Sequence, residues 1–310
     1  MVQLLAVGFA LLTLYTSTSK ASISCELPHL NSTQFWSSSQ FYQKYPEPSV
    51  AREIAVVEEV LAGNIPEWYR KFIPIEIQGT FRGEEVSLRL NVAPDYLAIG
   101  TDQDFVRVPL TSYAAQYIAS ALGFLLPTPH LVDVIFQQAQ VKLLPQPTNW
   151  YEHSGEMRKG SNYVIFNQSI EVQKNGRVGL TSGDKKDVVV TNLLDSAPSR
   201  VAIYGWHQAN GVPLQPLGVP HDLSYEDYSH GIRFVESHLQ IISKKTGRVR
   251  NASLVSAYLD PDLGAILNGQ HRAIRDIRAA RRCSLEFTQA MRLPASQCPP
   301  AINPCAVSKY

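Results

Sequence analysis

Residues 73–92 constrain the fold more than any other segment, because they contain two runs of alternating apolar and polar residues. In the second run Val86 and Leu88 alternate with polar or charged neighbours, and Arg82-Gly83 between the runs is typical of a turn. Alternation with a period of two is the pattern of a half-buried strand, and a short turn joins antiparallel neighbours. The segment therefore predicts an antiparallel hairpin.

Helical periodicity interrupts the strands at several points in the chain. Apolar residues recur at three- and four-residue intervals in residues 50–61, 112–122, 129–139 and 253–267. Further strands are expected at 105–108 and within 187–242, where Asn210-Gly211 indicates a hairpin turn. Because helices and strands do not alternate with a regular βαβ period, we predict an α+β fold. It is a single domain, from residue 45 to residue 270, with a mixed, mainly antiparallel sheet and packed helices.

The first 21 residues are predicted to be a secretory signal peptide. An apolar run from Leu4 to Leu14 precedes Ser19 and Ala21, which have the small size that a signal peptidase accepts. The run is too short to span a bilayer, and no later segment offers about 18 uninterrupted apolar residues. We therefore expect a secreted protein with no membrane partner after cleavage. A polar leader follows at residues 22–44, and a Cys/Pro-containing tail ends the chain at residues 271–310.

The cysteines and the glycosylation motifs agree with export. All four cysteines lie outside the predicted domain, and disulfide bonds among them would fasten the chain ends in an oxidising compartment. Their pairing is left open by the sequence. Asn-X-Ser/Thr motifs predict N-glycosylation at the surface. The cysteines are Cys25, Cys283, Cys298 and Cys305, and the acceptor asparagines are Asn31, Asn167 and Asn251.

Composition and missing motifs exclude several classes of function. The chain has 45% hydrophobic and 18% charged residues and a net charge of +1. It can bury a large core, but it lacks the basic density of a nucleic-acid-binding surface. It also lacks the G-x-S-x-G, P-loop and G-x-G-x-x-G motifs. We expect an extracellular small-molecule or polymer substrate and no nucleic acid.

Residues 200–235 carry the strongest chemical signal, because three of the eight histidines lie there. Strand alternation puts His207 on the same face as Val201, and alternation in the next predicted strand puts His230 on the same face as Ile232. Histidines aimed inward at strand ends suit a general base or a metal ligand, because imidazole titrates near neutral pH. Buried histidines bonded to backbone carbonyls are the structural alternative.

The remaining members of the predicted catalytic site surround these histidines in the sequence. His207 or His230 would be the general base, Asp227 the carboxylate that orients it, and Lys186 the group that stabilises a developing anion. His221 lies in the loop between the two histidines. A zinc site formed by His221 with His207 and His230 is an alternative, although the spacing is not that of a zinc motif such as H-E-x-x-H.

The charged residues 184–187 have two interpretations. Lys185 or Lys186 could bind an oxyanion or a substrate carboxylate. Alternatively, these residues form the solvated entry to the apolar strand that follows.

Two functional hypotheses follow from this segment. The first is a secreted hydrolase that acts on an extracellular amide, ester or glycan through a His/Asp centre, with Trp206 and Tyr228 contacting the substrate. The second is a secreted, non-catalytic binding protein with an aromatic recognition surface formed by Tyr204 and the same two residues.

Several motifs resemble those of an uncharacterised family of bacterial and fungal proteins. They include KKDVV at 185–189, YGWH at 204–207 and DYSHG at 227–231, within a likeness over residues 60–240. The resemblance implies no activity, and Asp184 departs from the family, in which His or Gln is common at that position. SHGIRFV is also similar to the histidine strand of papain-like cell-wall peptidases. That similarity implies a cysteine at a helix start, where this chain has Thr111-Ser112.

Overall fold

The computed structural model describes residues 27–29, 36–152, 155–269 and 272–293. Its helices are α1 Ser38–Lys44, α2 Val50–Leu61, α3 Ser112–Leu122, α4 Pro129–Gln138, α5 Gly160–Lys174, α6 Leu254–Leu259, α7 Pro261–Asn268 and α8 Leu285–Ala290. Its strands are β1 Ile73–Phe81, β2 Glu84–Val92, β3 Ala98–Gly100, β4 Phe105–Arg107, β5 Phe124–Leu125, β6 Val141–Lys142, β7 Thr181–Ser182, β8 Lys186–Val188, β9 Arg200–His207, β10 Pro213–Asp222, β11 His230–Gly231, β12 Val235–Ser243 and β13 Val249–Ser253. Short 3₁₀ turns lie at Glu67–Arg70, Asn149–Glu152, Glu156–Arg158 and Asn192–Asp195.

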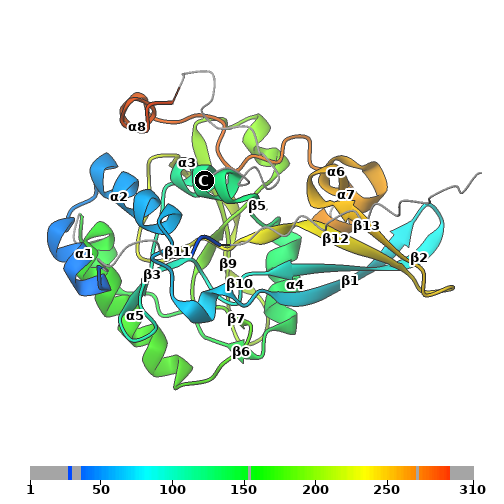
Figure 1. Ribbon diagram of the computed structural model, residues 1–310, viewed down its shortest axis with the longest axis horizontal. Coiled ribbons are helices and arrows are strands. Elements are labelled where there is room, and N and C mark those ends of the chain that lie inside the picture. The colour runs from blue at the N-terminus through cyan, green and yellow to red at the C-terminus, as the bar shows by residue number, and fades with distance from the viewer. Residues whose placement is uncertain (1–26, 30–35, 153–154, 270–271, 294–310) are drawn as a thin grey trace, which may run out of the picture.

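The larger sheet contains the predicted hairpin. Its strand order is β1-β2-β12-β13, with β5 also paired to β12, and every pairing in it is antiparallel. β1 and β2 meet at a two-residue turn in which Arg82 and Gly83 both have positive φ, as a tight hairpin requires. Val86 and Leu88 are fully buried. The alternation in residues 73–92 was therefore predicted correctly, and the hairpin extends to one side of the molecule (Figure 1).

The second sheet holds most of the motif residues. Its strand order is β10-β9-β8-β11, and the short strand β11 pairs with β8 in parallel. A turn at Gln208–Gly211 joins β9 to β10, as Asn210-Gly211 predicted. β10 is the edge strand, and its three prolines, Pro213, Pro216 and Pro220, lack the N–H groups that another strand would need for pairing. The fold is α+β with mainly antiparallel sheets, as predicted, but its strands divide among separate sheets.

Local signals set the helix ends. Thr111 caps α3, and Gly123 ends it in the left-handed conformation. The expected helix over 253–267 is wrong in one respect, because it breaks into α6 and α7 at Asp260-Pro261. Pro261 cannot continue a preceding helix, and the Asp260 carboxylate accepts hydrogen bonds from the first turn of α7. Helix α6 contacts β12 and β13 and helix α7 contacts β1, so the two helices pack against the larger sheet (Figure 1).

The packed domain extends beyond the predicted range 45–270 at both ends. The predicted polar leader includes helix α1, in which Phe41 and Tyr42 are buried and Tyr42 packs against Tyr163 of α5. The predicted tail includes helix α8, in which Phe287 is 0% exposed. The prediction missed both segments because each is a single short helix whose few apolar residues show no extended periodicity. The predicted signal peptide, residues 1–21, lies outside the described residues.

A substitution at Phe287 tests whether the tail stabilises the domain. Phe287 packs against Tyr113 at 4.8 Å between ring centroids, so Phe287→Ala should lower the free energy of unfolding by about 3–5 kcal/mol. Leu285→Ala is the matched control, because Leu285 is 70% exposed and should change stability by no more than about 0.5 kcal/mol. Equal denaturant midpoints for the two variants would show that α8 is not part of the cooperative unit.

Candidate functional site

The site is organised around strand β8 and the residue before it, Lys185. The Lys185 carbonyl accepts a hydrogen bond from the Trp206 N–H at 3.0 Å, and the Lys186 N–H donates to the Ser229 carbonyl at 2.7 Å. These bonds, with the pairing of β8 to β9 and β11, bring together three segments that are distant in the chain. The KKD, GWH and DYSHG motifs therefore meet in one place.

His230 is the most unusual residue of this assembly. Its side chain is 0% exposed, yet neither ring nitrogen has a hydrogen-bond partner among the described residues. The rings of Tyr225 and His221 lie 5.8 and 6.0 Å from it, measured between centroids. Burial lowers the pKa of His230 to about 4, and the charge of Lys186 acts in the same direction, while Asp227 opposes it. The imidazole is therefore neutral, with a free lone pair, over most of the accessible pH range.

Asp227 is held ionised beside His230. It accepts hydrogen bonds from the Ser229 N–H at 2.8 Å, the Ser229 hydroxyl at 2.5 Å and the Tyr225 hydroxyl at 3.0 Å. Burial would raise the pKa of Asp227, but the charge that His230 carries when protonated, the charge of Lys186 and the hydrogen bonds of Ser229 outweigh burial and lower it. Asp227 can therefore stabilise a positive charge on His230.

Lys186 and His221 are the partly exposed members of the cluster. The Lys186 ammonium lies 5.2 Å from the centre of the Trp206 ring, and its charge acts on His221, Asp227 and His230. Four predicted site residues, Lys186, His221, Asp227 and His230, therefore gather in one cluster, which we call the His230 cluster.

A pocket of about 330 Å³ lies beside the His230 cluster. The rings of His221 and Tyr225 stack at 4.2 Å between centroids and form part of its lining. The other lining residues are Arg158, Arg200, Pro220, Asp222 and Ser224. Because both stacked rings also contact the His230 ring, they separate His230 from this pocket.

His207 does not belong to the His230 cluster. Its Nε2 atom lies 2.9 Å from Asp133 Oδ1, to which the Tyr204 hydroxyl also donates, and its ring stacks on Phe136 of α4. The predicted face was wrong, because Gly205 and Trp206 both have positive φ and break the alternation of β9. His207 consequently lies with Tyr204 on the α4 side, while Trp206 packs into the main core.

Trp206 and Tyr228 are buried, so the predicted aromatic recognition surface does not form. Their rings meet edge to face at 6.4 Å between centroids, and Tyr228 also packs on Phe166. They support the His230 cluster from the side of the core.

No group of three or more His, Cys, Asp or Glu side chains in the described ranges is arranged to hold a metal ion. The zinc alternative therefore has no ligand set there, since His207 lies with Asp133 and away from His221 and His230.

A buried network of charges next to the cluster was missed by sequence reasoning. The idea of a solvated strand entry at residues 184–187 was wrong for Asp184, Lys185 and Asp187, which are all buried. They join Asp95 and Arg107, which form a buried bidentate ion pair, and Arg233, which lies 4.4 Å from the centre of the Tyr96 ring. A signal for Arg233 was present in the sequence, because an arginine between Ile232 and Phe234 interrupts an apolar run.

Two buried groups of the network have pKa values near neutral pH. Burial lowers the pKa of Lys185 to about 7, and the Lys185 ammonium donates to the Tyr228 carbonyl at 2.5 Å. Burial raises the pKa of Asp187 to about 6, and one of its oxygens accepts a hydrogen bond from the Tyr96 hydroxyl at 2.8 Å. Each unpaired buried polar group costs about 1–3 kcal/mol. Buried atoms without a hydrogen-bond partner concentrate here within the described structure, including both Asp184 oxygens, Asp187 Oδ1 and Trp206 Nε1. Two of them have only long ion-pair contacts, Asp184 Oδ2 with Arg107 at 3.9 Å and Asp187 Oδ1 with Arg233 at 3.7 Å. A concentration of this kind is typical of a functional site.

Two further predictions concern covalent modification. Asn167 lies in helix α5 at 6% exposure, where its carboxamide accepts from Arg107 and donates to the Phe105 carbonyl, so it is not a surface acceptor. Asn251 is exposed on β13, and Asn31 lies outside the described residues.

There is no free cysteine in the part of the chain that the structure describes. The other three cysteines, Cys25, Cys298 and Cys305, lie outside the described residues. The disulfide pairing therefore stays a prediction.

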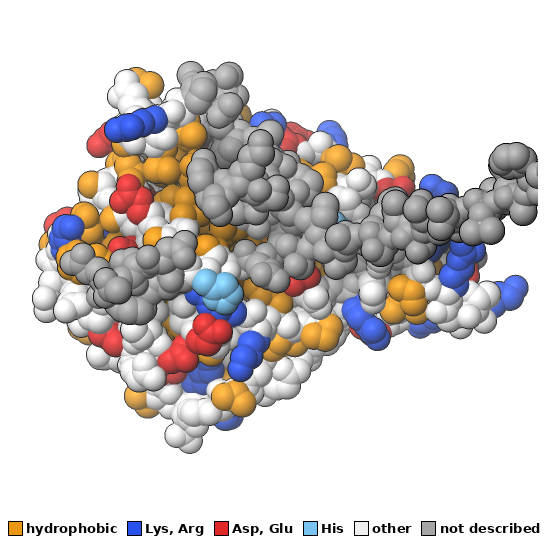
Figure 2. All heavy atoms as spheres, viewed as in Figure 1, with side chains coloured by type: hydrophobic (Ala, Val, Ile, Leu, Met, Phe, Trp, Pro, Cys, Tyr) orange, Lys and Arg blue, Asp and Glu red, His pale blue; other side chains and the backbone are white. Residues whose placement is uncertain are grey.

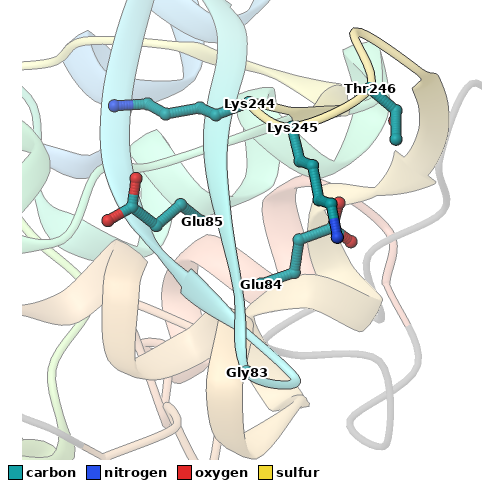
Figure 3. A pocket seen from close by; sticks show the side chains of 6 residues that line it. All are labelled: Gly83, Glu84, Glu85, Lys244, Lys245 and Thr246. Atoms are coloured by element: carbon teal, nitrogen blue, oxygen red, sulfur yellow. The ribbon is translucent and has the colours of Figure 1, made fainter.

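The other surface features lie away from the cluster. A pocket between the tips of two hairpins is lined by Gly83, Glu84, Glu85, Lys244, Lys245 and Thr246, and Glu84 and Lys245 point toward one another there (Figure 3). Positive and negative side chains are interspersed over the face in Figure 2. No helix among the described residues is long and apolar enough to cross a membrane.

No protein-family model, curated protein or solved structure gives a significant match to this chain. The resemblance to the bacterial and fungal family stays a prediction. As for the likeness to papain-like peptidases, the Thr111 hydroxyl donates to Glu53 and the Ser112 hydroxyl to the Leu223 carbonyl. Both hydroxyls at the helix start are therefore bonded away from the histidines.

The pKa of His230 predicts an acid-dependent loss of stability. Because the folded pKa is about 4 and that of an exposed imidazole about 6.5, the unfolded chain takes up the proton first. The contribution of His230 is fully present above about pH 6.5 and is lost as the pH falls toward 4, to a total of about 3 kcal/mol. Urea unfolding of the wild type and of His230→Gln from pH 8 to pH 4 should show a shallower acid loss in the variant. Parallel curves would contradict this account.

Burial at Asn167 also predicts the glycosylation pattern of material made through a secretory pathway. Peptide mass spectrometry after enzymatic deglycosylation should find Asn251 modified and Asn167 unmodified. A glycan on Asn167 would require its hydrogen bond to the Phe105 carbonyl to break, so finding one would disprove the local structure around Arg107.

Proposed function

We propose that this protein is a hydrolase in which His230 is the general base and Asp227 stabilises its protonated form. The observation that carries the proposal is the buried, neutral His230 ring with two unpartnered nitrogens beside an ionised carboxylate. Leaving such a ring unpaired costs free energy, and residues kept in this condition are typically reserved for a ligand or a proton transfer.

The proposed reaction is attack of water on an amide, an ester or a glycosidic carbon. One nitrogen of His230 takes a proton from the water as its oxygen bonds to that carbon. The imidazolium then returns the proton to the leaving group as the bond to it breaks, and Asp227 stabilises the intermediate positive charge. Lys186 lies within electrostatic reach of the same ring and would stabilise negative charge that develops on the substrate.

His221 and Tyr225 would control access to His230. Their stacked rings line the pocket on one side and contact His230 on the other. A substrate that binds in the pocket must therefore displace this pair before it reaches the base. We further propose that the protein acts outside the cell, after removal of residues 1–21. The alternative, a binding protein with an aromatic surface, is disfavoured because Trp206 and Tyr228 are buried.

Paired histidine substitutions test the assignment. A panel of p-nitrophenyl acetate, p-nitrophenyl glycosides and aminoacyl p-nitroanilides would first identify a turnover that depends on the protein. His230→Gln should then lower kcat by about 10²–10⁴-fold. His207→Gln is the matched control and should keep activity near the wild-type value, because His207 contacts Asp133 and lies outside the His230 cluster.

The pH profile of the same turnover provides a second criterion. Because the pKa of His230 is about 4, activity should rise as the pH passes about 4 and should not follow an exposed imidazole near 6.5. Loss of activity in His207→Gln with retention in His230→Gln would reverse the assignment.

A further inference from the structure

A third pocket, of about 590 Å³, lies between the 3₁₀ turn Glu67–Arg70 and the C-terminal end of α5. This volume lies within the range that is usual for small-molecule binding sites. The pocket shares no lining residue with the pocket beside His230. It is therefore a separate site from the one proposed for the hydrolase.

Aromatic rings form the apolar part of this pocket. Trp68 packs edge to face on Phe105 at 5.0 Å between centroids. Phe72 stacks on Phe124, which stacks in turn on Phe234 in the core. Trp68, Phe72 and Phe105 are each half-buried, so they are fixed by packing while part of each ring faces the pocket.

Charged groups of both signs surround the rings. The lining contains three cations, Lys71, Lys174 and Arg177, and three carboxylates, Asp95, Asp102 and Glu171. Arg107 also pairs with two of these carboxylates, Asp95 and Glu171, so the inner charges neutralise one another. The charges that remain are those of Lys71, Arg177 and Asp102.

The inner charges are paired, and the outer ones keep capacity for a ligand. Lys174 and Arg107 both contact Asp95, at 3.1 and 2.7 Å. In contrast, Lys71 is exposed and makes no hydrogen bond or ion pair with the described residues, and Asp102 is exposed with one oxygen bonded to the Glu67 N–H. The Lys71 ammonium can therefore donate hydrogen bonds to a ligand, and the Asp102 carboxylate can accept them, in a pocket that also has aromatic rings.

We propose that this pocket binds a neutral saccharide. A pyranose ring has an apolar face of C–H groups that packs on aromatic rings, and its hydroxyl groups both donate and accept hydrogen bonds. A lipid chain would bury the charged rim without satisfying it, which costs free energy.

The test is a titration of the full folded protein with cellotriose, N,N′,N″-triacetylchitotriose and mannotriose, each to about 10 mM, the range of weak binding. We expect saturable binding of at least one sugar, measured by calorimetry and by a change in tryptophan fluorescence. Trp68→Ala should weaken it by about tenfold or more. Lys71→Ala should weaken it severalfold without a change in the unfolding midpoint, which keeps the test valid if Trp68→Ala does not fold.

Val172→Ala is the control, because Val172 is on α5, is 80% exposed and does not line the pocket. It should bind the sugar as the wild type does. Sodium octanoate and phenylphosphonate are included as probes for an apolar chain and for an aromatic anion. The proposal is overturned if none of the three sugars binds, or if Lys71→Ala and every folded Trp68 variant bind as tightly as the wild type. Binding of octanoate or phenylphosphonate without any sugar would also overturn it.

Discussion

The hydrogen bonds of Lys185 hold the candidate site together. Its carbonyl accepts from the Trp206 N–H and from the Tyr96 hydroxyl, and its buried ammonium donates to the Tyr228 carbonyl. A single residue thereby joins three segments that are far apart in sequence. Because burial brings the pKa of Lys185 to about 7, the strength of this junction depends on pH near neutrality. The geometry around His230 depends on it, since Tyr228 lies between Asp227 and the Ser229–His230 segment.

The region around Lys185 contains many buried polar groups that are not fully paired. Arg233 donates to the carbonyls of Ala93 and Thr181, but its Nε atom has no hydrogen-bond partner among the described residues, and neither do the Asp184 oxygens. A sequence selected for stability alone would replace such groups with apolar side chains. Their presence beside a cluster of titratable residues is the physical reason for proposing a chemical function here. The opposite part of the molecule, the larger sheet with α6 and α7, is packed mainly by aliphatic side chains.

Much of the fold could be predicted from local patterns. The β1–β2 hairpin, the caps of α3 and the turn at Asn210-Gly211 depend on residues within a few positions of one another. The members of the His230 cluster could be named as well, because histidine, aspartate and lysine stood out in an otherwise apolar segment. The buried charge network could not, because residues 184–187 resemble a solvated turn until Asp95, Arg107 and Arg233 are placed around them. Helices α1 and α8 were missed because a single turn or two of helix leaves little periodicity.

The sequence by itself determined the longer helices, the β1–β2 hairpin, the turns and the candidate residues of the His230 cluster, because those depend on backbone preferences and on side-chain chemistry at each position. Only the tertiary structure decided which histidines meet. The parallel pairing of β11 with β8 brings His230 to Lys186, and the positive φ of Gly205 and Trp206 turns His207 toward Asp133. Neither effect is visible in a local pattern, since the first is a contact between distant segments and the second is a backbone conformation that a tryptophan adopts only when the surrounding packing enforces it.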